Sequence, residues 1–210
     1  MMLGGMNTST PASFWEQHYR TRRTWGGRAN PLLVEVATPL RPGLALDLGC
    51  GAGGDTIWLA ERGWHVTAVD IAHAAVDGLR AHAAGAGLGE RVTTARHDLA
   101  ESFPAGEFDL ISAQYFQTPF ALPRARVLRT AAEALRPGGL LLVVDHGSAA
   151  PWSWNQDPDT HHATPEEVAA EIGLDPAEWS ILRADTPRRR ATGPGGRTAT
   201  VTDNVLLVTR

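Results

Sequence analysis

The sequence has 210 residues, of which 43% are hydrophobic and 20% charged, and a formal net charge of −4; this composition suits one globular domain with a sizeable core and does not favour a general nucleic-acid binder. All 19 basic residues are arginine, which excludes chemistry that needs a lysine Schiff base, a lysine general base or a P-loop lysine. No apolar run reaches the ~18 residues that span a bilayer, and Cys50 is the single cysteine, so we expect a cytoplasmic protein without a membrane partner or an intrachain disulfide.

The first 40 residues predict two helices behind a disordered segment, residues 1–11. Ser13 followed by Glu16 is typical of a capping box and indicates a helix that begins at Ser13. The pair Asn30-Pro31 favours the start of a second helix. In chain order the predicted elements are helices at 13–22 and 32–40, strand 44–48, helix 55–62, strand 65–70, helix 72–84, strands 91–96 and 108–113, helix 124–135, strand 140–145, and helix 165–172, capped by Thr164 with Glu167.

The end of the chain has a different pattern from the alternating strands and helices before it. Two β-rich runs, Trp179–Arg190 and Thr198–Thr209, are joined by the turn Thr192–Gly196, which predicts a β-hairpin. The preceding strands are almost entirely apolar, as in a parallel sheet covered by helices on both faces. The fold class expected is therefore α/β, Rossmann-like and doubly wound, with a seven-stranded, mostly parallel sheet that ends in an antiparallel hairpin.

We expect one domain over residues 12–210. Its predicted parts are an N-terminal helical lid (12–40), a cofactor-binding core (44–146), an acceptor-side loop and helix (147–175) and the terminal hairpin (178–210).

The segment after strand 44–48 is rich in glycine. Gly49, Gly51 and Gly54 satisfy the spacing G-x-G-x-x-G, which nicotinamide sites and S-adenosylmethionine sites share because glycines let the backbone approach a ligand closely. Asp70 lies about 20 residues on, at the end of the next strand, where a carboxylate binds ribose hydroxyls in both kinds of site. This loop is therefore compatible with both an NAD(P)-dependent oxidoreductase and an S-adenosylmethionine-dependent enzyme.

Two features favour S-adenosylmethionine. Asp47 comes just before the glycines, where a carboxylate would repel a dinucleotide pyrophosphate but would attract an ammonium or sulfonium group. The predicted antiparallel hairpin is also unusual for doubly wound dehydrogenases, whose sheets continue with parallel strands.

Five segments resemble the ordered motifs of class I S-adenosylmethionine-dependent methyltransferases. They are LDLGCGAGGDTIWLA at 46–60, VTAVD at 66–70, HDL at 97–99, FDLI at 108–111 and LRPGGLLLVV at 135–144. The N-terminal residues 14–16 (FWE), Tyr19 and Trp25-Gly26 are similar to tellurite-resistance and thiopurine-type methyltransferases. The resemblance implies that S-adenosyl-L-methionine donates a methyl group to a small molecule and leaves as S-adenosyl-L-homocysteine. We expect a monomer or homodimer.

The resemblance also implies roles for the glycine loop and the acids beside it. The backbone of Gly49, Gly51 and Gly53 would line the methionine and ribose parts of the cofactor. Asp47 would orient its amino group, and Asp70 would bind both ribose hydroxyls.

Residues after the next strands would complete the cofactor site by the same resemblance. Ile71 would pack on the adenine face, Asp98 would accept from the adenine amino group, and Leu99 would donate its backbone N–H. Ala113 and Gln114 would border the transferred methyl. Asp98 is also interpretable as a helix cap.

Aromatic residues are expected to cover the two ends of the site. Trp15, Tyr19 and Trp25 would form a lid over the cofactor, unless they are the packing face of an amphipathic helix. Trp152 and Trp154 would wall the substrate pocket, unless they only pin a loop to the surface.

The acceptor needs a general base only if it holds its proton at neutral pH. His146, after strand 140–145, is the first candidate, because histidine titrates near neutrality; Tyr115 and Gln114 are further catalytic candidates, and Gln117 is a substrate-binding candidate. A heteroatom acceptor (sulfur, selenium, tellurium or nitrogen) is favoured over oxygen or carbon, since no base dyad is evident. No metal site is expected, because the acidic and histidine residues near His146 match no ligand spacing.

Overall fold

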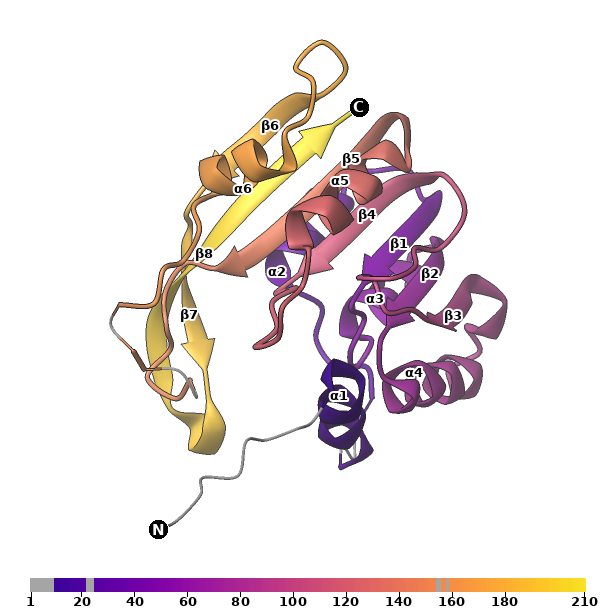
Figure 1. Ribbon diagram of the computed structural model, residues 1–210. Coiled ribbons are helices and arrows are strands. Elements are labelled where there is room, and N and C mark those ends of the chain that lie inside the picture. Colours follow the sequence, from indigo (N-terminus) through magenta and orange to yellow (C-terminus); the bar gives the residue numbers. More distant parts are fainter. Residues whose placement is uncertain (1–9, 22–24, 154–155, 158) are drawn as a thin grey trace.

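The computed structural model describes residues 10–21, 25–153, 156–157 and 159–210 (Figure 1). The helices are α1 (Pro11–Arg20), α2 (Pro31–Ala37), α3 (Gly54–Glu61), α4 (His73–Gly85), α5 (Arg124–Glu133) and α6 (Pro165–Ile172), with short 3-10 helices η1 (Gly89–Arg91) and η2 (Pro194–Gly196). The strands are β1 (Leu44–Leu48), β2 (His65–Asp70), β3 (Val92–Arg96), β4 (Phe108–Gln114), β5 (Leu135–His146), β6 (Ser180–Asp185), β7 (Arg188–Thr192) and β8 (Thr198–Thr209). None of the helices in these described segments is long and apolar enough to cross a membrane.

One mixed sheet organises the chain. Its strand order is β3-β2-β1-β4-β5-β8-β6, and β7 pairs with the remaining length of β8. Neighbouring strands among β1 to β5 run parallel, whereas β8 is antiparallel to β5, β6 and β7. The order reverses between β1 and β4, and ligands of open α/β sheets bind outside the carboxyl ends of the strands at such a switch point.

Helices cover both faces of the sheet, as its apolar strands predict. Leu46 and Leu48 of β1 pack with Leu128 of α5 in one core, which α6 also joins. Ala45 lies in the other core with Leu59 of α3, together with residues of α2 and α4. Figure 1 shows α5 and α6 on one side of the sheet and α1 beyond the ends of the central strands, next to α4. The alternation along β1 places Asp47 on the side of α3, and this fixes the surroundings of that carboxylate.

Most elements confirm their predictions, but the predicted start of the first helix is wrong. Thr10, not Ser13, is the N-cap of α1, and its side chain accepts from the Ser13 N–H. Glu16 does not close a capping box. It accepts from the Ala74 N–H at 3.0 Å and pairs with Arg20. The predicted box fails because Glu16 finds its backbone partner on α4, a contact that local spacing does not reveal.

The C-terminal pairing is more elaborate than the predicted hairpin. The run Trp179–Arg190 divides into β6 and β7 around Pro187, which has no N–H to give to a ladder. The Pro187 carbonyl instead accepts from the Asp203 N–H at 3.0 Å. As a result β8 pairs with β7 through its first half and with β6 through its second, and the sheet has eight strands instead of seven.

Candidate cofactor site

The glycine loop after β1 has a backbone that only glycine adopts readily. Gly49, Gly51 and Gly53 have φ angles of 69°, 50° and 80°, all in the left-handed region. Space is also limited: a Cβ on Gly51 would lie 2.7 Å from the Tyr19 hydroxyl, and one on Gly49 would lie 3.1 Å from the Phe116 ring. Residues from α1 and from the segment after β4 therefore cover the loop closely.

Asp70, the last residue of β2, is held against this loop. Its side chain is buried; one oxygen accepts from the Gly51 N–H at 3.1 Å, and the other accepts from the Ala72 N–H at 2.9 Å. Burial raises the pKa of Asp70, while backbone hydrogen bonds from Ala72, Gly51 and Ile71 oppose that rise. Because each carboxylate oxygen has two lone pairs, both oxygens keep the capacity to accept one more hydrogen bond.

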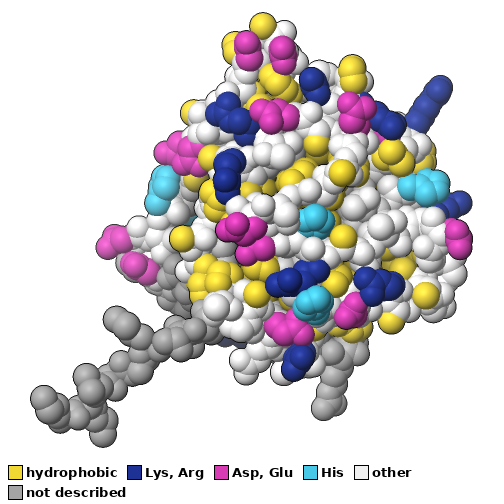
Figure 2. Space-filling view, turned by 45° about the vertical axis from the view of Figure 1, so that its right-hand side comes forward, with side chains coloured by type: hydrophobic (Ala, Val, Ile, Leu, Met, Phe, Trp, Pro, Cys, Tyr) yellow, Lys and Arg dark blue, Asp and Glu magenta, His cyan; other side chains and the backbone are white. Residues whose placement is uncertain are grey.

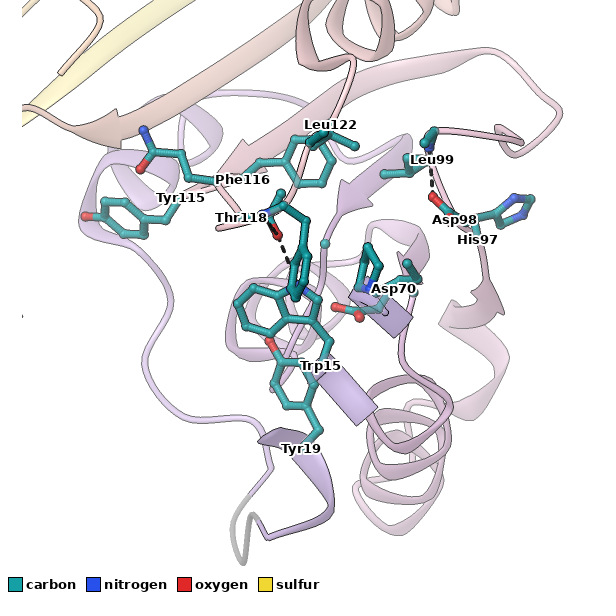
Figure 3. A pocket seen from close by; sticks show the side chains of 17 residues that line it. Trp15, Tyr19, Asp70, His97, Asp98, Leu99, Tyr115, Phe116, Thr118 and Leu122 are labelled. Carbon is teal, nitrogen blue, oxygen red and sulfur yellow. Dashed lines mark hydrogen bonds between the residues drawn. The ribbon is translucent and has the colours of Figure 1, made fainter. Parts of the chain in front are cut away.

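A pocket of about 270 Å³ opens above the loop and Asp70 (Figure 3). Its walls come from α1, the glycine loop, the ends of β2 and β3, and the segment after β4. The lining residues are Pro11, Trp15, Tyr19, Gly49, Asp70, Ile71, His97, Asp98, Leu99, Ala100, Tyr115, Phe116, Gln117, Thr118, Phe120, Ala121 and Leu122. Figure 3 shows Trp15 and Tyr19 on one side of Asp70 and the segment His97–Leu99 on another. The Trp15 Nε1–H donates to the Thr118 hydroxyl at 3.4 Å, which joins α1 to the opposite wall.

Two further acids lie beneath the loop. Asp47 is buried and accepts from the Thr56 hydroxyl at 2.6 Å, and Asp55 accepts from the Asn30 N–H at 2.6 Å. Burial, with smaller effects from Asp55 and Asp70, raises the pKa of Asp47 to about 7. Burial also raises the pKa of Asp55 to about 6. Because both pKa values lie near neutrality, a bound cation would favour the ionised forms of Asp47 and Asp55.

These raised pKa values predict the pH dependence of stability. The pKa of Asp47 rises from its ordinary value of 3.8 to about 7 on folding, so between these values the folded state binds more protons than the unfolded state. Stability contributed by Asp47 is therefore fully present below about pH 4 and is lost as the pH rises through about 7. We expect Asp47→Asn to reduce the fall in Tm between pH 5 and pH 8. An equal fall in variant and unmodified protein would contradict this.

The structure separates some residues predicted to share one site. Gln114 does not line the pocket: its amide accepts from Asn30 Nδ2 at 2.7 Å and donates to the Ser112 hydroxyl at 2.9 Å. Ala113 is wholly buried within the sheet, where it borders no open space. Trp25 also lies outside the pocket, with its ring packed against Gly78 of α4. Of the three residues predicted to form the lid, the structure places Trp15 and Tyr19 at the pocket and Trp25 outside it.

A second pocket contains the predicted base and one of the predicted substrate residues. His146 and Trp152 line it, together with residues of β7 and β8, and neither lines the first pocket. The His146 ring stacks on Tyr115 with centroids 4.2 Å apart. Tyr115 and Gln117 line the first pocket, so the two pockets adjoin at the Tyr115–His146 ring pair. Trp154 lies outside the described residues.

Several site residues were not predicted from the sequence. Phe116, Phe120 and Leu122 form an apolar wall after β4, and Asn30 links Asp55 to Gln114. The aromatic run after β4 was a usable signal for the wall. No local pattern identifies Asn30, because it reads simply as the cap of α2, a role that it also has.

Known proteins are similar to this chain in sequence and in fold. Residues 45–139 match a family model described as a methyltransferase domain. A ubiquinone biosynthesis O-methyltransferase of Caulobacter sp. (strain K31) is 40% identical over 50% of this chain and 42% of its own length. The ribosomal RNA small subunit methyltransferase C of Alcanivorax borkumensis is 34% identical over 58% of this chain and 38% of its own.

Residues 45–139 therefore carry a methyltransferase domain, and the fold is that of class I S-adenosylmethionine-dependent methyltransferases. A structure solved in work on the conversion of a disulfide bond into a thioacetal group during echinomycin biosynthesis has a similar fold, with 25% identity and a TM-score of 0.70. The match covers 95% of this chain and 92% of the other. The chain spans less than half the length of the two curated relatives. The glycine loop and Asp70 lie within the matched part of the methyltransferase domain, and a nicotinamide site is not supported.

Proposed function

We propose that the protein binds S-adenosylmethionine in the pocket above the glycine loop and transfers its methyl group to a small molecule. The observation that carries this proposal is the position of Asp70, a buried carboxylate with spare acceptor capacity between the glycine loop and the pocket. Asp70 would accept from the ribose hydroxyls. The left-handed loop would leave room for the methionine part, above the acidic floor formed by Asp47.

The adenine would lie between the ends of β2 and β3. Ile71 and Leu99 line this part of the pocket and offer apolar contacts to a flat ring. One Asp98 oxygen accepts from the Ala100 N–H at 3.0 Å, so the carboxylate caps a turn and still has an oxygen for the adenine amino group. When bound, the cofactor supplies a sulfonium-activated methyl group. The protein then has mainly to position the acceptor and exclude water. The hydrogen bond between Trp15 and Thr118, which joins two walls of the pocket, suits that task.

The acceptor atom that we favour is a heteroatom, with sulfur first. None of the described residues that line the first pocket pair as a histidine–carboxylate base dyad, and a thiolate needs no base to attack a sulfonium methyl group. The solved structure from work on a thioacetal is similar over nearly the whole chain and adds support. Acidic and basic side chains are interspersed on the face in Figure 2, so that face offers no continuous basic surface for a nucleic acid.

An oxygen acceptor is the second candidate, favoured by the O-methyltransferase relative. His146 would then be the base. Burial lowers its pKa, which keeps the imidazole in the neutral form that accepts a proton. With phenol as acceptor, we expect His146→Ala to slow turnover by about 10²-fold or more, the usual contribution of a general base, while turnover of thiophenol and the Kd of S-adenosylhomocysteine stay unchanged. Equal effects on both acceptors would remove His146 as a base.

The test of the proposed function is S-adenosylhomocysteine formation with a matched acceptor set. Thiophenol, aniline and phenol, each also as its 4-carboxylate, differ only in the nucleophile and in one charge. We expect the thiols to react fastest. Faster reaction of the phenols would favour the second candidate, and no turnover above the acceptor-free rate with any compound would contradict the transferase assignment for these acceptor classes.

A further inference from the structure

The second pocket lies at the end of β5, beside the cofactor site. Its walls come from the segment after β5 and from β7 and β8, and the lining residues are His146, Ser148, Ala149, Ala150, Trp152, Ser153, Thr160, His162, Arg189, Ala191, Thr192 and Val201. The Tyr115–His146 ring pair separates it from the first pocket. A molecule in the second pocket would therefore approach the cofactor from the carboxyl end of β4 and β5.

The charged side chains that line the two pockets differ in sign. Asp70 and Asp98 line the first pocket, and none of its described lining residues is an arginine. Arg189, His146 and His162 line the second pocket, and its described lining includes no carboxylate. A pocket with acids suits a cationic cofactor. A pocket with a guanidinium and two imidazoles suits an anion, even though the chain as a whole is acidic.

Arg189 is held rigidly at the wall between the pockets. Its Nε–H and one terminal nitrogen donate to Asp203, which is almost fully buried, and the same terminal nitrogen donates to the Tyr115 hydroxyl at 2.8 Å. Among the residues that the structure describes, its second terminal nitrogen, Nη1, has no hydrogen-bond partner. A guanidinium fixed in this way loses little conformational freedom when it binds an oxyanion.

Trp152 supplies an apolar wall for the same space. Its ring packs so closely on the turn after β7 that a Cβ on Gly193 would lie 2.2 Å from it. The indole is therefore fixed by the hairpin and offers a flat face to a planar ligand.

We propose that the second pocket binds the methyl acceptor as an organic anion, with a planar body against Trp152 and the negative group at Arg189, supported by His162. This inference rests on the proposed function only in naming the ligand an acceptor. The anionic group is a carboxylate beside the nucleophile, or the ionised nucleophile itself.

The direct test is binding of three probes that share one ring and differ in charge. Benzoate, benzamide and benzamidine are titrated calorimetrically into protein saturated with S-adenosylhomocysteine. We expect benzoate to bind at least tenfold more tightly than benzamide, and benzamidine to bind more weakly than both. Equal affinity of benzoate and benzamide, or displacement of S-adenosylhomocysteine by benzoate, would overturn the proposal.

Two variants test whether Arg189 supplies the charge that favours benzoate over benzamide. Arg189→Gln should remove the preference for benzoate, whereas Arg190→Gln, on the same strand but exposed and bonded to Thr198, should keep it. If Arg189→Gln does not fold because Asp203 is left unpaired, Arg189→Gln with Asp203→Asn replaces it, with the same expected loss. A preference that survives in the double variant would overturn the proposal, whether or not the protein turns over any acceptor.

Kinetics then distinguish the two sources of the anion. A KM for 4-mercaptobenzoate that is at least tenfold below that for thiophenol, and a loss of this difference in the Arg189 variant, would indicate a separate carboxylate. Similar KM values for both thiols that rise together in the variant would indicate the thiolate itself. KM values that do not depend on Arg189 would contradict both forms of the proposal.

Discussion

Replacement of Asp70 with asparagine is expected to weaken binding of S-adenosylhomocysteine by about tenfold to a hundredfold, the effect of losing one charge-assisted hydrogen bond. The carboxylate accepts from the Gly51 and Ala72 N–H groups and still has capacity for ribose hydroxyls. An asparagine amide has one acceptor oxygen, and its nitrogen would meet a backbone donor. The change therefore disturbs the ligand contact and the support of the loop together. Calorimetric titration with S-adenosylhomocysteine measures the effect.

The matched control is Asp77→Asn. Asp77 is an exposed carboxylate on α4 that pairs with Arg80, and it is not among the residues that line the pocket. This substitution removes one negative charge of the same type, but away from the pocket lining. It should therefore leave the Kd of S-adenosylhomocysteine unchanged within twofold. A Kd unaffected by Asp70→Asn, or raised equally by both changes, would show that the cofactor does not contact Asp70.

Arg124→Met is expected to lower the free energy of unfolding by about 3–5 kcal/mol, as removal of one partner of a buried ion pair does. Asp145 is almost fully buried, and Arg124 Nη2 lies 2.6 Å from one of its oxygens. The other Asp145 oxygen is buried with no hydrogen-bond partner among the described residues. Burial raises the pKa of Asp145, and Arg124 opposes this rise. Without the arginine, the carboxyl group must take up a proton or remain as an unpaired buried charge.

Urea unfolding at pH 7 measures this loss, and a second change identifies its cause. Asp145→Asn in the Arg124→Met background removes the orphaned charge, so it should recover part of the lost stability. Arg124 also donates to the Phe116 carbonyl at 3.1 Å, so the single variant should loosen the apolar wall of the cofactor pocket and weaken S-adenosylhomocysteine binding. Unfolding of Arg124→Met at the same urea concentration as the unmodified protein would contradict the account.

The parts of the fold that local patterns determine were predictable. The bounds of β2 and α6 match their predictions, because a short apolar run ending in Asp70 and the capping box of Thr164 with Glu167 are complete signals within a few residues. The α1 cap and the break at Pro187 were missed. In both places a polar backbone or side-chain group finds its partner far along the chain, on α4 and on β8.

The division of the site into two pockets shows the same limit. The sequence correctly places Gln114, Tyr115 and His146 at the carboxyl ends of neighbouring strands. The directions of the side chains after β4 depend on the backbone of Tyr115, whose φ of 50° is in the left-handed region and turns the chain out of the strand. Figure 3 shows Tyr115 directed away from Asp70, while Phe116 lies on the side of Leu122. No residue pattern predicts a left-handed tyrosine, because the partners of its hydroxyl lie far along the chain: it donates to Asp203 and accepts from Arg189.

Thermal denaturation in the presence of single cofactors tests most directly whether the first pocket is an S-adenosylmethionine site. A ligand that binds only the folded state raises Tm as its concentration exceeds its Kd. We predict that S-adenosylmethionine and S-adenosylhomocysteine each raise Tm in a saturable way, that Asp70→Asn reduces the rise at a fixed concentration, and that NAD and NADP leave Tm unchanged. A rise in Tm with NAD or NADP, with none for S-adenosylhomocysteine, would contradict the account.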